Sequence, residues 1–137
     1  MARIRPTRER SYWNWLARSF VSGSSVAIEP LGIEPRGFDR ICLGFPKWTF
    51  SCPPVNRFLE LIPRPSSVDF GLFMSYGGFD EDRAFRAMTR KVARRGQVVA
   101  RLAVKRDRVG SPACLSAVEA FCEAVVAARD ALFELKV

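Results

Sequence analysis

Ten basic side chains fall between residues 83 and 108, where Asp107 is the only acidic residue. Guanidinium groups hold phosphate oxygens through planar, paired hydrogen bonds, so such a cluster suits a polyanion. A charge run can also be a plain solvated face, but a face that serves solubility alone mixes both signs. The segment therefore predicts a nucleic-acid-binding site made of Arg83, Arg86, Arg90, Lys91, Arg94, Arg95, Arg101, Lys105, Arg106 and Arg108.

Catalytic chemistry finds little support in the sequence. The chain contains no histidine, which removes the commonest general base and every triad built on imidazole. Asp69-Phe70-Gly71 spells the metal-binding triplet of protein kinases, but no glycine-rich loop or catalytic-loop motif accompanies it. The acidic residues 80–82 suit the start of a helix as well as a cation site. We expect no enzymatic activity, no cofactor and no metal site.

The four cysteines do not form a zinc-binding pattern. Nine residues separate Cys42 from Cys52 and seven separate Cys114 from Cys122, whereas structural zinc sites place ligands two to four residues apart. We expect free, mostly buried thiols in a reducing intracellular compartment. That compartment would be the cytoplasm or a virion, with the mitochondrion as the alternative.

Length and charge indicate one basic domain. The chain has 137 residues, with 22 Lys and Arg against 14 Asp and Glu, and its net charge is +8. No uncharged stretch approaches the roughly twenty residues that a membrane span needs. The first 18 residues carry five arginines and one glutamate, which is typical of a transit peptide or of a plain basic arm. We expect a basic arm and a short helix over residues 1–20.

Two helices are predicted from apolar periodicity and end signals. Over residues 81–95, Phe85, Met88 and Val92 share one side and the basic residues the other, with Asp80 as N-cap and Gly96 as a left-handed stop. The second helix spans residues 111–136 and begins with a serine cap followed by proline. Between them, residues 98–104 alternate as in a strand, although a second short helix remains open.

The middle of the chain is harder to assign. Seven prolines between residues 30 and 65 predict an irregular segment with short strands at 41–43 and 48–50. Residues 68–74 alternate like a third strand, but the same stretch could open a helix that ends at Gly77.

Several landmarks together resemble the coat proteins of rod-shaped plant viruses of the tobacco mosaic type. They are Tyr12-Trp13-Asn14-Trp15, Trp48, Arg57-Phe58, Gly77-Gly78-Phe79-Asp80 with Arg83, and the stretch from Ala124 to Ala131 before Leu135. The resemblance implies a four-helix bundle with a small sheet, stacked around RNA, in which Arg83 and Arg86 would meet phosphates.

These observations predict a mainly α fold, a helix bundle with a small sheet and a Pro-rich irregular segment, with α+β as the alternative. The predicted function is that of an RNA-backbone-binding structural protein in a ribonucleoprotein assembly or helical capsid, with self-association. Phosphate contacts should dominate, because Phe85 lies on the apolar side and does not interleave the arginines. The alternatives are a basic protein-interaction subunit of an organellar complex, docking on an acidic partner, and peripheral binding to an anionic membrane.

Overall fold

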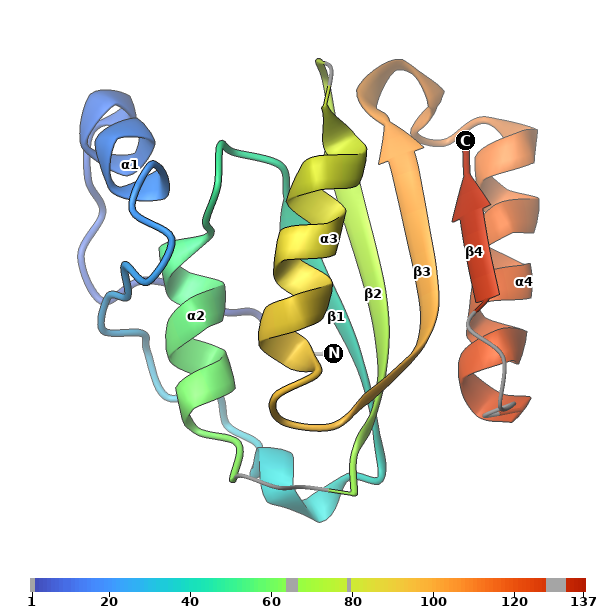
Figure 1. Cartoon of the computed structure of the whole chain (residues 1–137), viewed down its shortest axis with the longest axis horizontal. Helices are drawn as coiled ribbons and strands as arrows, with labels where there is room; N and C mark the ends of the chain where they lie inside the picture. Colours follow the sequence, from blue (N-terminus) through green and yellow to red (C-terminus); the bar gives the residue numbers. More distant parts are fainter. Residues whose placement is uncertain (1, 64–66, 79, 128–132) are drawn as a thin grey trace.

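The chain folds around a parallel β-sheet. The computed structural model describes residues 2–63, 67–78, 80–127 and 133–137. In sheet order, the strands are β1 (Arg40–Pro46), β2 (Asp69–Tyr76), β3 (Gln97–Lys105) and β4 (Phe133–Lys136), and every neighbouring pair is parallel. The helices are α1 (Tyr12–Ser19), α2 (Pro53–Glu60), α3 (Glu81–Val92) and α4 (Pro112–Ala127) (Figure 1).

The prediction of a mainly helical bundle is therefore wrong, and so is its α+β alternative. From β1 onward, strands and helices alternate along the chain, which defines an α/β fold with crossover helices. The four-helix bundle implied by the resemblance to coat proteins is accordingly not the fold of this chain.

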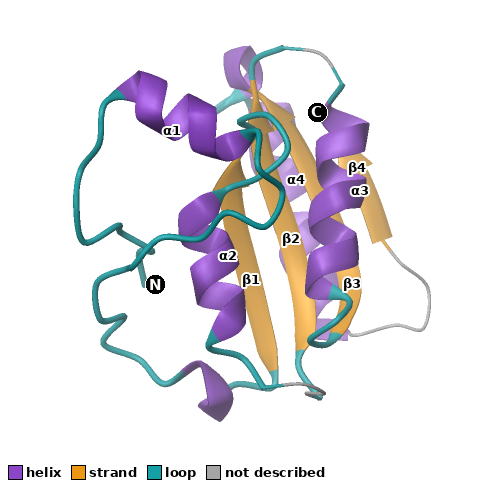
Figure 2. Cartoon of the chain, turned by 60° about the vertical axis from the view of Figure 1, so that its left-hand side comes forward, coloured by secondary structure: helices purple, strands orange, loops and turns teal. Residues whose placement is uncertain are grey.

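Helices cover both faces of the sheet (Figure 2). The first two crossover helices, α2 and α3, pack on one face, and α4 packs on the other. Gly71 in β2 allows the close approach of α4, since a Cβ atom there would lie 2.4 Å from Val125 and 2.8 Å from Phe121. Phe70, Leu72 and Met74 of β2 are fully buried in the core shared with α2 and α3. Phe73, on the other side of the strand, is 42% exposed.

Helix α2 was missed because its prolines suggested irregular chain. Pro53 and Pro54 occupy the first turn, where a missing N–H interrupts no helical hydrogen bond. Val55, Phe58 and Leu59 then turn toward the core and are at least 95% buried. The prolines therefore begin a helix where they were expected to prevent one.

Helix α3 begins where it was predicted, with Asp80 as the N-cap residue, but it ends at Val92, three residues before the predicted Arg95. Asp80 has a left-handed backbone, with φ of 63°, and its side chain makes no capping hydrogen bond. Gly96 does not have a positive φ. It is needed for space instead, because a Cβ atom there would lie 2.1 Å from the carbonyl oxygen of Val68.

Some of the predicted strands are present in the structure and one is not. Residues 98–104 lie in β3, and residues 69–74 of the predicted strand 68–74 lie in β2, which confirms both strands and makes both helical alternatives wrong. Residues 41–43 lie in β1, whereas residues 48–50 follow that strand as irregular chain. The short helix expected before residue 20 is α1, and Ser11 Oγ accepts a hydrogen bond from the Asn14 N–H at 3.4 Å.

The C-terminal helix is shorter than predicted. Its start is confirmed, since the Cys114 N–H donates to Ser111 Oγ at 3.2 Å. Helix α4 ends at Ala127 and residues 133–136 are strand β4, so the prediction of helix to Lys136 is wrong. Residues 128–132 of the predicted helix lie outside the described residues. The same holds for Phe79, one of the landmarks of the resemblance to coat proteins. Among the described residues, no helix combines the length and apolar character needed to cross a bilayer.

Candidate nucleic-acid interface

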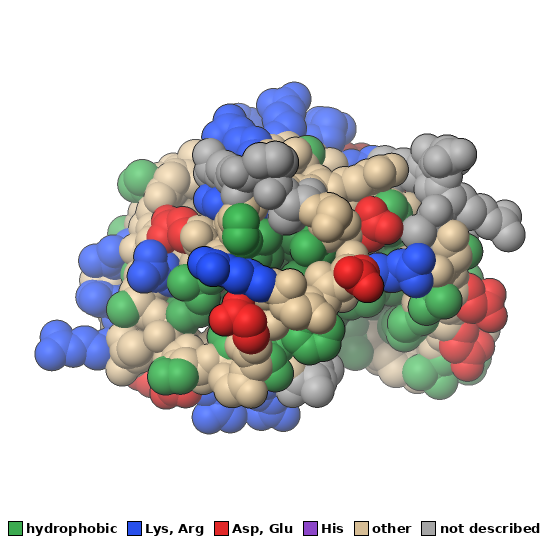
Figure 3. Space-filling model, turned by 90° about the horizontal axis from the view of Figure 1, so that it is seen from below, with side chains coloured by type: hydrophobic (Ala, Val, Ile, Leu, Met, Phe, Trp, Pro, Cys, Tyr) green, Lys and Arg blue, Asp and Glu red, His purple; other side chains and the backbone are tan. Residues whose placement is uncertain are grey.

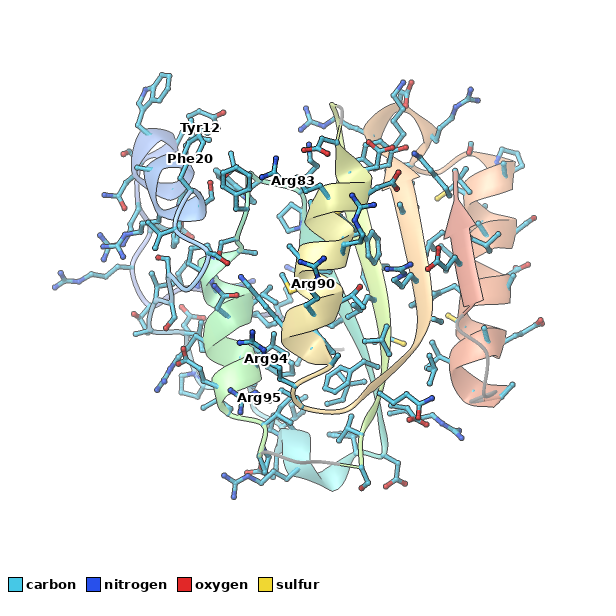
Figure 4. All side chains as sticks on the ribbon, in the orientation of Figure 1. Tyr12, Phe20, Arg83, Arg90, Arg94 and Arg95 are labelled. Atoms are coloured by element: carbon cyan, nitrogen blue, oxygen red, sulfur yellow. The ribbon has the colours of Figure 1, made fainter. Side chains whose placement is uncertain are left out.

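Four arginines form one stripe on the outer side of α3 and the turn after it. Arg83, Arg86, Arg90 and Arg94 are three or four residues apart, so they follow one another along one side of the helix. All four are exposed, because the opposite side of α3 is buried against the sheet. Figure 4 shows Arg83 and Arg90 on α3 and Arg94 just after its end. Arg83 and Arg90 are separated by about 10 Å along the helix axis. We call these four residues the arginine stripe.

Three of the four arginines of the stripe form no ion pair within the described residues. Arg83 forms an exposed ion pair with Asp80 at 3.9 Å. Within the part of the chain that the structure describes, no carboxylate lies within 4.0 Å of Arg86, Arg90 or Arg94. The stripe therefore retains nearly all of its positive charge at the surface.

Two of the predicted binding residues bond within the chain instead. Lys91 is partly buried, donates to the carbonyl oxygen of Ser22 and to Asn56 Oδ1, and burial lowers its pKa. The Arg95 guanidinium donates to the carbonyl oxygen of Ile62 at 2.6 Å. Both side chains bind α3 and the turn after it to other segments of the same chain. We therefore leave them out of the candidate interface.

Arg101 is also used inside the fold. Its side chain is only 18% exposed, forms an ion pair with Glu134 and donates to Thr89 Oγ1 at 3.3 Å. The guanidinium lies 5.6 Å from the centre of the Phe85 ring. Burial lowers the pKa of this arginine. It ties β3 to β4 and α3, so we leave it out as well.

The last three predicted residues lie at the carboxyl end of β3. Lys105 pairs with Asp107 at 3.5 Å, and both groups are exposed. Arg106 and Arg108 belong to a short 3-10 turn, and both are exposed. The ten predicted residues thus divide into the arginine stripe, a second exposed group after β3, and three internal residues.

The end of the sheet at which the strands begin carries side chains of both charges. Seen from the amino ends of the strands, both positive and negative side chains surround exposed hydrophobic ones (Figure 3). Among the described residues, charges of both signs thus alternate at this end, whereas the arginine stripe is positive.

An ion pair joins the first turn of α3 to the last strand. The Lys136 ammonium donates to Glu81, and this hydrogen bond lowers the pKa of the Glu81 carboxyl below 4.5. A carboxyl whose pKa is lower in the folded state than in the unfolded state stabilises the folded state. This contribution is complete at pH values above the unfolded-state pKa, and it is lost as the pH falls through the folded-state pKa.

We therefore expect the amide resonances of β4 to titrate with an apparent pKa below 4.5. An NMR pH titration measures this, and Glu81→Gln should remove the transition. In Lys136→Gln, the Glu81 transition should move back toward 4.5. A Glu81 carboxyl that titrates at its ordinary value beside Lys136 would contradict the role of this pair.

A large apolar cavity lies away from the arginine stripe. It measures about 880 Å³ and runs along β1 residues 41–46, with residues 2–6 opposite and rings of Trp48, Phe58 and Phe73 in its lining. Side chains from both faces of β1 reach it, so it follows the outer edge of that strand. Its lining offers mainly apolar contact, unlike the stripe.

No metal-ligand cluster occurs in the described part of the chain. All four cysteines are free, as predicted, but two of them are not buried. Cys52 and Cys114 are buried, whereas Cys42 and Cys122 are exposed. Partial burial raises the pKa of the Cys42 thiol, with a further contribution from Cys122.

Sequence reasoning missed Phe50 as a member of this surface. The Arg83 guanidinium lies 4.9 Å from the centre of the Phe50 ring, although the two residues are far apart in sequence. The available signal was the concentration of aromatic residues between Phe45 and Phe50 in a segment rich in proline.

Comparison with known proteins identifies no family. No family model matches the chain, and no solved structure matches it. The chain is similar to an uncharacterized protein of Archaeoglobus fulgidus, with 42% identity over 72 residues. The match covers 53% of this chain and 45% of that protein, so it spans less than half of the relative's length.

Proposed function

We propose that this protein binds the backbone of nucleic acid, with RNA as the partner, through the arginine stripe of α3. The observation that carries the proposal is the set of exposed guanidinium groups at Arg86, Arg90 and Arg94 with no described carboxylate within 4.0 Å. Arginines at helical spacing offer parallel donors to successive phosphates, and bound phosphates would relieve their mutual repulsion.

The proposed role is structural, as a subunit of a ribonucleoprotein assembly. Arg106 and Arg108, exposed after β3, extend the positive surface beyond the helix. A helical capsid loses its support because the four-helix fold is absent. The rival is an acidic protein partner, which would use the same arginines.

The salt dependence of binding tests this proposal. If four arginines meet phosphates of a single strand, log K should fall with log salt at a slope of about −3. Arg86→Gln with Arg90→Gln should reduce the slope to about −1.5, because two counterions fewer are released. Fluorescence anisotropy of labelled single-stranded RNA over a potassium chloride series measures both slopes.

A matched control separates the stripe from total charge. Arg36→Gln with Arg57→Gln removes two exposed arginines elsewhere and should leave the slope unchanged. Equal losses in both double variants, or a slope near zero in the parent protein, would sink the proposal. Tighter binding to polyglutamate than to RNA of equal charge would favour the acidic protein partner instead.

A further inference from the structure

Exposed aromatic side chains gather where α1 meets the segment after β1. Tyr12 is 61% exposed, Trp13 74%, Phe20 56% and Phe50 41%. Large aromatic rings on a surface leave apolar area in water, so four of them together indicate a contact site. We call these four residues the aromatic platform.

The rings of the platform are ordered by one another. Tyr12 and Trp13 meet edge to face, with centroids 5.4 Å apart, and Phe20 and Phe50 do the same at 5.9 Å. The ring of Tyr12 also lies 5.9 Å from that of Trp48, at an interplanar angle of 34°. Their faces and edges are therefore held at the surface without being covered by the core.

The fold fixes the platform in position. The Phe50 N–H donates to the carbonyl oxygen of Ser19 at 3.0 Å. The hydroxyl groups of Ser19 and Thr49 are 2.7 Å apart, and Ser19 is fully buried. These bonds fasten the end of α1 to residues 49–50, so little ordering would be needed on binding.

Phe50 joins the Phe20 side of the platform to the arginine stripe. Phe50 lies between Phe20 and Arg83, since its ring contacts the Phe20 ring and lies under the Arg83 guanidinium. Figure 4 shows Tyr12 and Phe20 on α1 at the same end of the molecule as Arg83, with Arg90 farther along α3. Segment 47–52 follows the carboxyl end of β1, the side on which open parallel sheets bind their ligands.

From this juxtaposition we infer that the platform stacks the bases of a single strand whose phosphates lie on the arginine stripe. This inference rests on the proposed function and narrows its substrate to single-stranded nucleic acid. Aromatic rings beside a basic groove are the means by which proteins hold unpaired bases of any sequence. In a duplex, the bases are already stacked within the helix and cannot reach the platform.

Binding to a labelled oligouridylate, compared with an RNA duplex of equal phosphate number, tests the inference. The parent protein should prefer the single strand, and its Trp fluorescence should fall on binding. Trp13→Ala should weaken single-strand binding about tenfold and leave duplex binding and the salt slope unchanged. Trp13→Phe should restore most of the affinity because it keeps a ring.

Controls make each outcome decisive. Val21→Ala, at a residue 60% exposed and close to Phe20, should change neither affinity. If the protein bound single strand and duplex equally and Trp13→Ala changed neither affinity, the inference would be overturned. A slope of log K against log salt of about −3 would still support backbone binding in that case. Equal weakening of both ligands by Trp13→Ala would also overturn it. Absence of binding to either RNA would reject the proposed function itself.

Discussion

Replacing Gly96 by alanine is expected to destabilise the protein by about 3 kcal/mol. The added Cβ would lie 2.1 Å from the carbonyl oxygen of Val68 and 3.0 Å from the Phe70 ring. The oxygen belongs to the backbone, and the Gln97 N–H donates to it at 3.1 Å, so it cannot move without breaking the start of the β2 and β3 pairing. A loss of this size is a large part of the roughly 5–15 kcal/mol that stabilises a domain.

Urea unfolding of Gly96→Ala, followed by circular dichroism, measures this loss. Gly23→Ala is the matched control, because nothing lies within 4 Å of a Cβ atom there and its φ is not positive. That variant should be neutral or slightly more stable, since alanine reduces the entropy of the unfolded chain. Equal stability of the two variants would show that the turn after α3 is not tightly packed against β2.

Replacing Asn56 by alanine is also expected to cost about 3 kcal/mol, because several buried or partly buried polar groups would lose a hydrogen-bond partner together. The Asn56 amide group donates to Ser51 Oγ at 2.7 Å and to the carbonyl oxygen of Ser24, while its own oxygen accepts from Lys91. Asn56 is only 8% exposed. It therefore links α2, α3 and residues 22–24 through a single side chain.

The adjacent position on α2 supplies the control. Arg57 makes an exposed ion pair with Glu60 at 2.8 Å, so Arg57→Ala should cost no more than about 0.5 kcal/mol. Thermal unfolding of both variants should show a clear fall in Tm for Asn56→Ala alone. Similar melting of Asn56→Ala and the parent protein would mean that water replaces the amide without loss.

Local signals in the sequence were sufficient for individual elements. The position of α3 follows from its apolar spacing, and β3 follows from the alternation after Gly96. Ser111 and Pro112 marked the start of α4 correctly. Each of these signals is contained within a few neighbouring residues.

The topology was missed because it depends on a regular alternation of strands and helices. Counting Pro53 and Pro54 as breakers removed α2, which left β1 and β2 without a crossover. Residues 68–74 form a short and mostly apolar run, and periodicity alone does not distinguish such a run from part of a buried helix. The helical alternative for this stretch therefore stayed open. With α2 in place, the same sequence would have predicted a parallel sheet.

The candidate interface was predictable as a segment but not residue by residue. Periodicity placed Arg86 and Arg90 opposite the apolar side of α3, and they are exposed. It could not foresee that Lys91 meets Asn56 or that Arg101 meets Glu134, because those partners come from distant parts of the chain. The aromatic platform depends equally on a tertiary contact, between α1 and residues 49–50.

The exposed edge of strand β1 affects how readily the protein aggregates. Between Ile41 and Phe45 this strand carries no charged residue, and in the described chain it has a neighbour, β2, on one side alone. Such edge strands pair with strands of other molecules unless another segment covers them. Residues 2–6 line the cavity along this strand, and Ile4 packs against the core. We therefore expect proteolytic removal of residues 2–6 to expose this edge and promote aggregation, and also to remove the contact of Ile4 with the core.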